Sequence, residues 1–372
     1  MEAIVLYPSP GMGHLISMVE VGKLLLTHHP SFTIIILITT PPFNAGSTAS
    51  YIAAVSATTP SISFHQLPII SLDPAAYDSV EALMRDLIHL NNVHADAALT
   101  AISLTSTVHS LIIDLFCYPA LEIAAKLNIP AYYFFTSGAS CLALYLHMPS
   151  IHRNTTENLK NLNTLFHLPC LPPIPLNHLP EPMLIRDTTV YDFLINCTTH
   201  LAKSAGIIIN TFETLEPKAV KALSKGFSIP DGPNQTPPVF CIGPLIDTNK
   251  GRSKGNGDDD DDKGIECLKW LDSQPSQSVV FLCFGSMGLF SKKQLMEIAV
   301  GLEKSGQRFL WVSESGFVSA EEVEKRVREL MESKEGNSLR NRTMAKRKEA
   351  VAALREGGPS RAALAQLLKC WA

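Results

Sequence analysis

The chain has 372 residues, of which 46% are hydrophobic and 18% charged, enough apolar side chains for about two folded domains and too few charges for a disordered protein. Its net charge of −4 gives no electrostatic basis for binding nucleic acid or an anionic membrane. No apolar run reaches the ~18 to 20 residues of a membrane-spanning helix, so we expect small molecules as partners, and neither nucleic acid nor a membrane.

Eight cysteines are spread along the chain without a C-x-x-C pair. Several lie in apolar runs, as Cys283 does, which predicts buried, reduced thiols and a cytoplasmic location. The first residues, 1–7, lack basic side chains and a cleavage site, so they predict a first strand and no signal peptide.

Residues 1–245 alternate short, continuously apolar runs with helical stretches, as in a parallel sheet buried on both faces. This pattern predicts an N-terminal Rossmann-like domain over 1–245. The expected strands are Ala3–Tyr7, Phe32–Thr39, Ser61–Leu67, Ser110–Leu115, Ala131–Phe135 and Gly206–Asn210. The expected helices are His14–Thr27, Ser79–Ser103, Pro119–Leu127 and Ser137–His147.

Two stretches interrupt this alternation. The proline-rich residues 160–190 predict an irregular loop at a substrate cleft. Residues 246–263 are rich in Gly, Lys and Asp, which predicts a flexible acidic linker. The alternative is a D-x-D metal site at Asp258–Asp260, and we prefer the linker because no strand flanks the acidic run.

A second strand and helix pattern begins after the linker but stops early. Residues 264–312 predict two helices, Ile265–Asp272 and Lys292–Ser305, and two strands, Ser278–Phe284 and Arg308–Val312. From Ser319 to Trp371 the pattern is only helical, starting with a capping box at Ser319–Glu322. We therefore expect an incomplete C-terminal domain over 264–372.

The turn Pro8–His14 joins the first strand to the first helix, and its glycines allow close approach of a ligand to the backbone. His14 stands at the helix N-terminus, whose partial positive charge disfavours protonation. A neutral histidine is what a general base for a hydroxyl requires. Asp114 closes another strand and could accept a hydrogen bond from the imidazole of His14. The alternative for Asp114 is an aspartate that caps a turn.

Ordered motifs along 3–312 resemble those of the plant family 1 UDP-glycosyltransferases, in particular flavonoid and chalcone O-glucosyltransferases. The motifs are Pro10–His14, Ile112–Phe116, Tyr133–Gly138, Gly206–Glu213, Cys241–Leu245 and Val280–Gly288. The resemblance implies the α/β GT-B fold of two Rossmann-like domains. It also implies transfer of a hexose, glucose in the first instance, from a UDP-sugar to a phenolic hydroxyl. This transfer inverts the anomeric carbon and needs no metal or other cofactor.

The same resemblance assigns roles to individual residues. His14 would deprotonate the acceptor hydroxyl and Asp114 would orient and stabilise His14. Thr136 matches a position that touches the sugar, and Gly285 and Ser286 match a turn that contacts the diphosphate. The expected acceptor-binding residues are Gly13, Phe116, Tyr118, Phe135, Tyr145 and Phe193.

The family's donor-binding segment, which runs from Trp-Ala-Pro-Gln through His-Cys-Gly-Trp-Asn-Ser to an acidic residue and Gln, is absent from the sequence. The residues after Ser313 resemble the part of the family that follows this segment. We therefore expect an internal deletion of ~100 residues near Val312–Ser313. Such a chain would bind UDP-glucose weakly and turn over little.

Two alternatives stay open. One is a non-catalytic protein that keeps the phenol-binding cleft or binds a partner. The other is a Rossmann oxidoreductase, although Ile16 replaces the third glycine of its fingerprint and no acidic residue ends the strand Phe32–Thr39. We expect a monomer, with self-association through any exposed surface of the C-terminal domain.

Overall fold

The computed structural model describes residues 2–42, 48–162, 164–168, 170–226, 236–246, 261–283, 290–312 and 319–371. The chain divides into two compact units, one formed by Met1–Asp247 with Glu349–Ala372 and the other by Thr248–Lys348. The end of the chain therefore groups with the first unit, whereas the sequence pattern had assigned all of 264–372 to the second. The predicted linker, 246–263, lies largely outside the described residues, and a helix already begins at Asp261.

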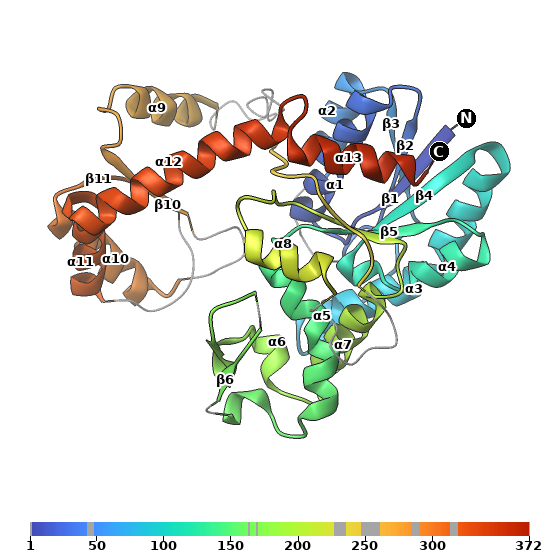
Figure 1. Cartoon of the computed structure of the whole chain (residues 1–372), viewed down its shortest axis with the longest axis horizontal. Coiled ribbons are helices and arrows are strands. Elements are labelled where there is room, and N and C mark those ends of the chain that lie inside the picture. The colour runs from blue at the N-terminus through green and yellow to red at the C-terminus, as the bar shows by residue number, and fades with distance from the viewer. Residues whose placement is uncertain are drawn as a thin grey trace. The chain divides into compact units, whose positions relative to one another are not determined.

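The described part of the first unit contains a parallel sheet of seven strands in the order β3-β2-β1-β4-β5-β8-β9. Strands β1 to β5 of this sheet are labelled in Figure 1. The strands are β1 (Glu2–Tyr7), β2 (Thr33–Ile38), β3 (Ile62–Gln66), β4 (Thr107–Asp114), β5 (Ala131–Phe135), β8 (Gly206–Ile209) and β9 (Val239–Cys241). All six expected strands are present, so the predicted parallel α/β sheet is confirmed. The last strand, β9, was not predicted, because it is short and its paired position beside β8 depends on tertiary contacts.

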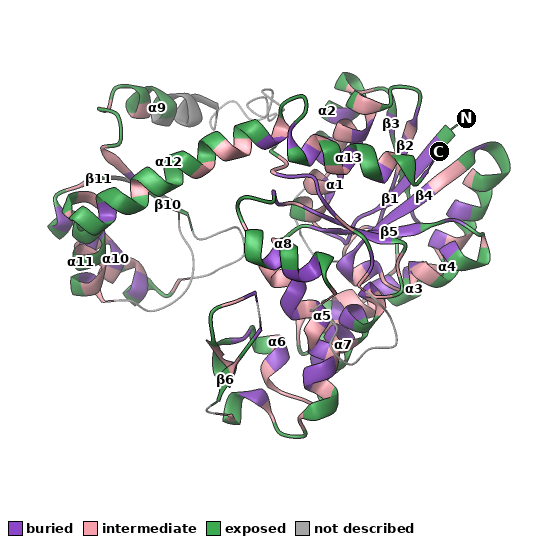
Figure 2. Ribbon diagram, in the orientation of Figure 1, coloured by how far each residue is buried: buried purple, intermediate pink, exposed green. Residues whose placement is uncertain are grey.

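Helices cover both faces of this sheet, which explains why its strands are continuously apolar. On one face, alternate strand residues such as Val5, Ile113 and Tyr133 pack with helices that precede or follow them in the chain. These helices are α3 (Val80–Thr105), α4 (Ala120–Lys126), α5 (Ala139–Asn154), α7 (Thr189–Leu201) and α8 (Pro217–Ser224). On the other face, the intervening residues such as Ile4 and Ile112 pack with α1 (Met12–His28), α2 (Ala49–Thr58) and α13 (Pro359–Lys369). The buried strands between partly exposed helices are visible in Figure 2.

Helix α13 belongs to the core of the first unit although it comes from the far end of the sequence. Its Leu364 and Leu367 are buried with the strands of the sheet, and the Ser360 hydroxyl donates to the Gly243 carbonyl at 2.6 Å. The ring of Trp371 meets that of Tyr132 edge-on at 5.6 Å. The C-terminal residues therefore complete one face of the sheet.

The region expected as an irregular loop, 160–190, is made of short pieces. It contains the 3-10 turns η3 (Leu159–Asn161) and η4 (Leu176–His178), the antiparallel pair β6 (Leu165–Phe166) and β7 (Ile174–Pro175), and the single-turn helix α6 (Glu181–Leu184). The prolines limit each piece to a few residues.

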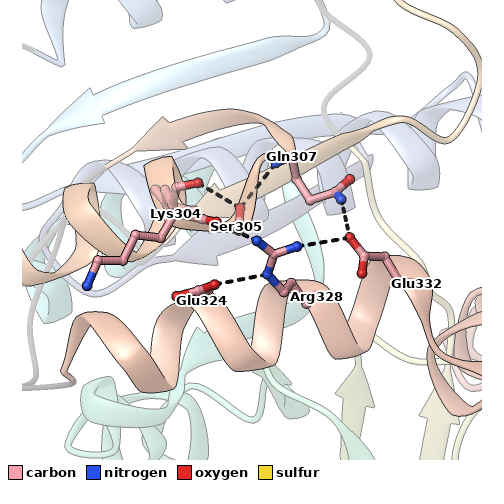
Figure 3. A network of polar contacts seen from close by, with 7 residues as sticks. Lys304, Ser305, Gln307, Glu324, Arg328 and Glu332 are labelled. Atoms are coloured by element: carbon pink, nitrogen blue, oxygen red, sulfur yellow. Dashed lines mark hydrogen bonds and ion pairs between the residues drawn. The ribbon is translucent and has the colours of Figure 1, made fainter.

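The second unit contains the helices and strands expected for it. They are α9 (Asp261–Asp272), β10 (Val279–Cys283), α10 (Lys292–Ser305), β11 (Arg308–Val312), α11 (Ala320–Glu332) and most of α12 (Lys334–Leu354). Ser319 caps α11, since its hydroxyl accepts from the Glu322 amide as predicted. Arg328 joins α11 to α10: it donates to the Lys304 carbonyl at the end of α10 and to Glu324 on its own helix (Figure 3).

Strands β10 and β11 form a parallel pair of which one face packs on helices. Val280 lies in a small cluster with Ile298, Leu302 and Val327. Phe281, which points to the opposite face, is 61% exposed. Parallel sheets normally have helices on both faces, so among the described residues of this unit the second face of β10 is uncovered.

Candidate active site

The candidate residues of the first unit lie where the order of the strands reverses. Strand β1 has β2 on one side and β4 on the other, and the chain builds outward in opposite directions from this point. In open α/β sheets, ligands bind outside the carboxyl ends of the strands at this place. His14 follows β1, Asp114 ends β4 and Thr136 follows β5, so three adjacent strands present their ends here.

The turn between β1 and α1 depends on Gly11. Its φ of 124° lies in the region that side chains with a Cβ rarely adopt. Helix α1 then begins at Met12, and His14 lies in its first turn. Gly13 is exposed and has open space around its Cβ position, so the backbone geometry gives no reason for glycine there.

The imidazole of His14 is hydrogen-bonded to Asp114, as the sequence suggested, at 2.7 Å between Nδ1 and Oδ2. The carboxylate can only accept, so Nδ1 of His14 donates and carries the proton. In the neutral imidazole the lone pair is then on Nε2. Asp114 is 3% exposed, which shields its charge from solvent.

The environment raises the pKa of His14. Burial lowers the pKa, but the hydrogen bond that His14 donates to Asp114 and the charge of Asp114 raise it by more. From the sequence, the helix N-terminus was expected to disfavour protonation, but the pKa is raised because Asp114 contributes more than burial takes away. Neutral His14, the form that can accept a proton, therefore requires a higher pH than an isolated histidine would.

Aromatic rings continue from His14 along the carboxyl end of β4. The His14 ring meets the edge of Phe116 at 6.1 Å, in the turn η2 (Leu115–Cys117) that follows Asp114. Phe116 stacks on Phe193 of α7 at 5.8 Å, and Phe193 contacts Tyr118 at 6.1 Å. Three of the expected acceptor-binding residues thus form one cluster with the catalytic candidates.

Two other expected acceptor residues form a separate pair. Phe135 is 4% exposed and meets the ring of Tyr145 on α5 edge-on at 5.6 Å. Burial raises the pKa of Tyr145 to about 12. Both residues pack in the hydrophobic core, and no ring contact joins them to His14 among the described residues, so their packing is that of core residues.

Thr136 is exposed directly after β5, and the turn that carries it is held by Glu216. The Glu216 carboxylate accepts from the amides of Ala139 and Ser140 at 2.8 and 2.9 Å and from the Thr211 hydroxyl at 2.7 Å. It therefore caps helix α5, for which the N-cap residue Gly138 has no side chain. A Cβ at Gly138 would lie 2.5 Å from Oε2 of Glu216, so this packing requires glycine.

Gly285 and Ser286, the expected diphosphate contacts, lie outside the described residues, as does the alternative metal site Asp258–Asp260. Within the described ranges, no group of three or more His, Cys, Asp or Glu side chains could hold a metal ion. None of the helices described is both long enough and apolar enough to cross a membrane.

Three further residues, Glu216, His89 and His200, contact Tyr118 or the turn that carries Thr136 and were not predicted from the sequence. Glu216 was overlooked because the amides it caps lie 76 and 77 residues earlier in the chain. His89 of α3 and His200 of α7 contact Tyr118 through their rings. The sequence does not show which face of α3 or α7 meets Tyr118, so neither histidine could be identified from it.

The chain is similar to known plant enzymes, although no family model matches it. It is 48% identical to UDP-glycosyltransferase 88B1 of Stevia rebaudiana over 309 residues, which are 83% of this chain and 65% of that protein. It is 47% identical to phloretin 2'-O-glucosyltransferase of Malus domestica over 319 residues, 84% of this chain and 65% of that protein. The chain thus spans 65% of the length of these two relatives.

A third relative aligns along its whole length. Anthocyanidin 5,3-O-glucosyltransferase of a Rosa hybrid cultivar is 38% identical over 482 residues, covering 100% of this chain and 99% of that protein. Because this chain has 372 residues, 482 − 372 = 110 of those positions have no counterpart in it.

Solved structures give the same fold. UGT2 of Phytolacca americana, complexed with UDP-2fluoro-glucose and pterostilbene, matches with a TM-score of 0.85 and 27% identity and covers 100% of both chains. UGT71G1 of Medicago truncatula, complexed with UDP-glucose, matches with a TM-score of 0.84 and 25% identity, covering 100% of this chain and 98% of that one. The predicted GT-B fold class is confirmed by these matches.

Proposed function

Because this chain belongs to the plant UDP-glycosyltransferases, we propose that it retains the acceptor-activating part of an enzyme that transfers a hexose from a UDP-sugar to a phenolic hydroxyl. The acceptor class we propose is a flavonoid or a related phenol, and the sugar is glucose. The observation that carries this proposal is the 2.7 Å hydrogen bond between His14 and Asp114 at the reversal point of the sheet.

His14 acts as the general base in this proposal. Asp114 holds the proton on Nδ1, so the Nε2 lone pair takes the proton of the acceptor hydroxyl. The acceptor oxygen then attacks the anomeric carbon from the face opposite the UDP group, and the bond between that carbon and UDP breaks. The configuration inverts, and the buried charge of Asp114 stabilises the imidazolium that forms.

The aromatic cluster supplies the wall for the acceptor ring. Phe116 lies next to His14, and Phe193 stacks behind it. A flat phenol against this wall gains apolar contact while its hydroxyl stays within reach of His14. Phe135, Tyr145 and Gly13 remain weaker candidates.

On the donor side, we propose that Thr136 contacts the sugar and that Gly285 and Ser286 contact the diphosphate. The UDP-sugar is then the co-substrate, with no further cofactor and no metal. Thr136 is exposed at the carboxyl end of β5, next to β4 in the sheet, which suits contact with a ligand bound there.

We propose that this chain holds the donor poorly. The donor segment expected for the family is absent from the sequence. The described part of the second unit has a two-stranded sheet, and among its residues one face of β10 is uncovered. Charge-assisted hydrogen bonds to a diphosphate contribute about 1.5–3 kcal/mol each, so their loss costs several orders of magnitude in affinity.

A phenol-binding protein without transferase activity is therefore the second candidate function. It would keep the site around His14 and lack productive donor binding. We expect a monomer, with the uncovered face of β10 around Phe281 as the surface for any self-association. The cytoplasmic location expected from the cysteine pattern stays a prediction.

Two assays on the purified chain separate these functions. Calorimetric titration with a two-ring phenol measures acceptor binding, and chromatography of a reaction with UDP-glucose and the same phenol measures transfer. Binding without transfer supports the non-catalytic function, while transfer that is lost in His14→Ala supports the enzyme. Absence of phenol binding would remove the basis of both.

A further inference from the structure

Tyr118 has an unusual set of neighbours for a residue beside the candidate active site. Its ring contacts those of Phe193, at 6.1 Å, and His200, at 4.7 Å, both on α7. Its hydroxyl lies 3.1 Å from Nε2 of His89 on α3. Tyr118 follows η2 directly and is thus only four residues beyond Asp114 in the chain.

The ring contacts connect this group to the catalytic candidates. From His14 they run through Phe116 to Phe193, and Phe193 also contacts His89 at 6.4 Å. Each step between ring centroids is about 6 Å, the ordinary spacing of neighbouring aromatic rings. Phe116 and Tyr118 are partly exposed, and Phe193, which is 5% exposed, lies in contact with both. In the proposed acceptor site, a ligand with its first ring at His14 and Phe116 would place its second ring toward Tyr118.

The hydrogen bonds of His89 determine the direction of its contact with Tyr118. Nδ1 of His89 lies 2.7 Å from the Arg85 carbonyl oxygen, one helical turn earlier. A carbonyl only accepts, so Nδ1 donates, and Nε2 of the neutral ring is an acceptor. The hydroxyl of Tyr118 therefore donates its hydrogen to His89.

This arrangement leaves the Tyr118 oxygen as an acceptor. A phenolic hydroxyl has one hydrogen to donate and lone pairs to accept with. Burial raises the pKa of Tyr118, so the hydroxyl keeps its hydrogen near neutral pH, and His89 takes it. The oxygen can then accept a hydrogen bond from a ligand, but it has no hydrogen left to offer to one.

The position of the pair favours contact with a ligand over a purely structural role. Tyr118 is partly buried and His89 is exposed, so both polar atoms lie at the edge of the core. Tyr133, by contrast, is fully enclosed at 0% exposure. His89 is also held by Arg85 and Phe193, so the Tyr118 oxygen has a fixed position.

We propose that Tyr118, oriented by His89, accepts a hydrogen bond from a free hydroxyl on the second ring of the acceptor. The site would thus favour polyphenols with hydroxyls on both rings over ethers that cannot donate a hydrogen at that place. The inference rests on the proposed acceptor site at His14 and adds a specificity determinant to it. Tyr118 selects the substrate, and His89 is a positioning residue.

The test compares two ligands and two substitutions by calorimetric titration of the full chain. The ligands are 4,4′-dihydroxystilbene and its monomethyl ether, which differ by one donor hydrogen and one methyl group. Tyr118→Phe removes the accepting oxygen and keeps the ring. Tyr77→Phe is the matched control, since it removes a hydroxyl bonded to Asp86 on the same helix as His89.

We expect the unsubstituted chain and Tyr77→Phe to bind the dihydroxy compound about 3- to 10-fold more tightly than the ether, the loss of one hydrogen bond. In Tyr118→Phe the two ligands should bind with more nearly equal affinities, because the accepting oxygen is gone. The symmetric dihydroxy compound can bind in two equivalent orientations. This raises its affinity by the same factor in the unsubstituted chain, Tyr77→Phe and Tyr118→Phe, so the factor cancels when their ratios are compared. His89→Gln, which moves the neighbouring polar atom, should reduce the ratio as well, whereas Tyr77→Phe should keep it.

An unchanged ratio in Tyr118→Phe, or no preference in the unsubstituted chain, would overturn the inference and leave the proposed function standing. Failure of both ligands to bind the unsubstituted chain would overturn the proposed acceptor site and this inference together. The two failures are therefore distinguishable within one set of titrations.

Discussion

Nδ1 of His14 lies 2.7 Å from Oδ2 of Asp114, across two adjacent strands from which the sheet is built in opposite directions. The two residues are 100 positions apart in the sequence. Their contact joins the start of α1 to the end of β4 and places the lone pair of the neutral His14 ring on Nε2. The following predictions depend on this contact and on the packing that supports it.

Replacing Asp114 with Asn should lower the pKa of His14. The substitution keeps the size of the side chain but removes the charge that raises this pKa. NMR titration of the histidine ring protons, assigned with His14→Ala, measures the shift directly. Any glucosyl transfer by the chain should fall about 100-fold or more, as for the loss of general-base assistance. An unchanged His14 titration would contradict the role given to Asp114.

The contribution of His14 to stability should depend on pH with a defined sign. Its pKa is raised in the folded chain, so the contact with Asp114 stabilises the fold fully below the unfolded pKa. This contribution is lost as the pH rises through the folded pKa. Urea unfolding at about pH 6 and about pH 8.5 should therefore show a larger cost of His14→Ala at the lower pH. An equal loss of free energy of unfolding at both pH values would contradict a raised pKa of His14.

Transfer should have the opposite dependence on pH. Only neutral His14 can take the acceptor proton, so any rate should rise as the pH increases through the raised pKa. A rate that falls over this range would argue against His14 as the base.

Replacing Glu216 with Ala should destabilise the first unit by about 1–2 kcal/mol. The substitution leaves the amides of Ala139 and Ser140 without the carboxylate that caps α5. Glu213→Ala is the matched control, because Glu213 is an exposed acidic residue of the same loop. Denaturant unfolding followed by circular dichroism measures both variants, and equal effects would contradict the capping role.

Replacing Trp371 with Ala should lower the free energy of unfolding of the first unit by about 3 kcal/mol. Trp371 is 5% exposed and packs on Tyr132, and its carbonyl oxygen lies 2.9 Å from Nδ1 of His109. Trp270→Ala in the second unit is the control. The ring of Trp270 is 40% exposed, so its removal should lower the free energy of unfolding much less. Similar losses for both variants would indicate that the C-terminal segment does not stabilise the sheet.

Much of the first unit could be predicted from the sequence because its signals are local. Continuous apolar runs such as Ile34–Ile38 identified buried strands, and Asp114 at a strand end pointed to the edge where ligands bind. The place of His14 at the start of α1 followed from the glycines of the turn after β1. The contact between His14 and Asp114 was therefore predictable from the sequence.

Other features could not be predicted from the sequence because they depend on contacts between distant segments. The return of α13 to the first unit rests on the burial of Leu364 and Leu367 against strands more than 100 residues away in the chain. Phe135 and Phe193 are both buried aromatic residues, but only Phe193 is joined through Phe116 to His14. The raised pKa of His14 results from burial, which lowers it, and from Asp114, which raises it. Which of the two is larger depends on the distance to Asp114, and the sequence does not contain that distance.

We propose that the chain keeps the acceptor site and lacks an effective donor site. Calorimetric titration of the purified chain with UDP tests it most directly, with phenol binding by the same sample as proof of a folded acceptor site. We predict phenol binding without UDP binding in the micromolar range. Micromolar binding of UDP by this 372-residue chain would contradict the account.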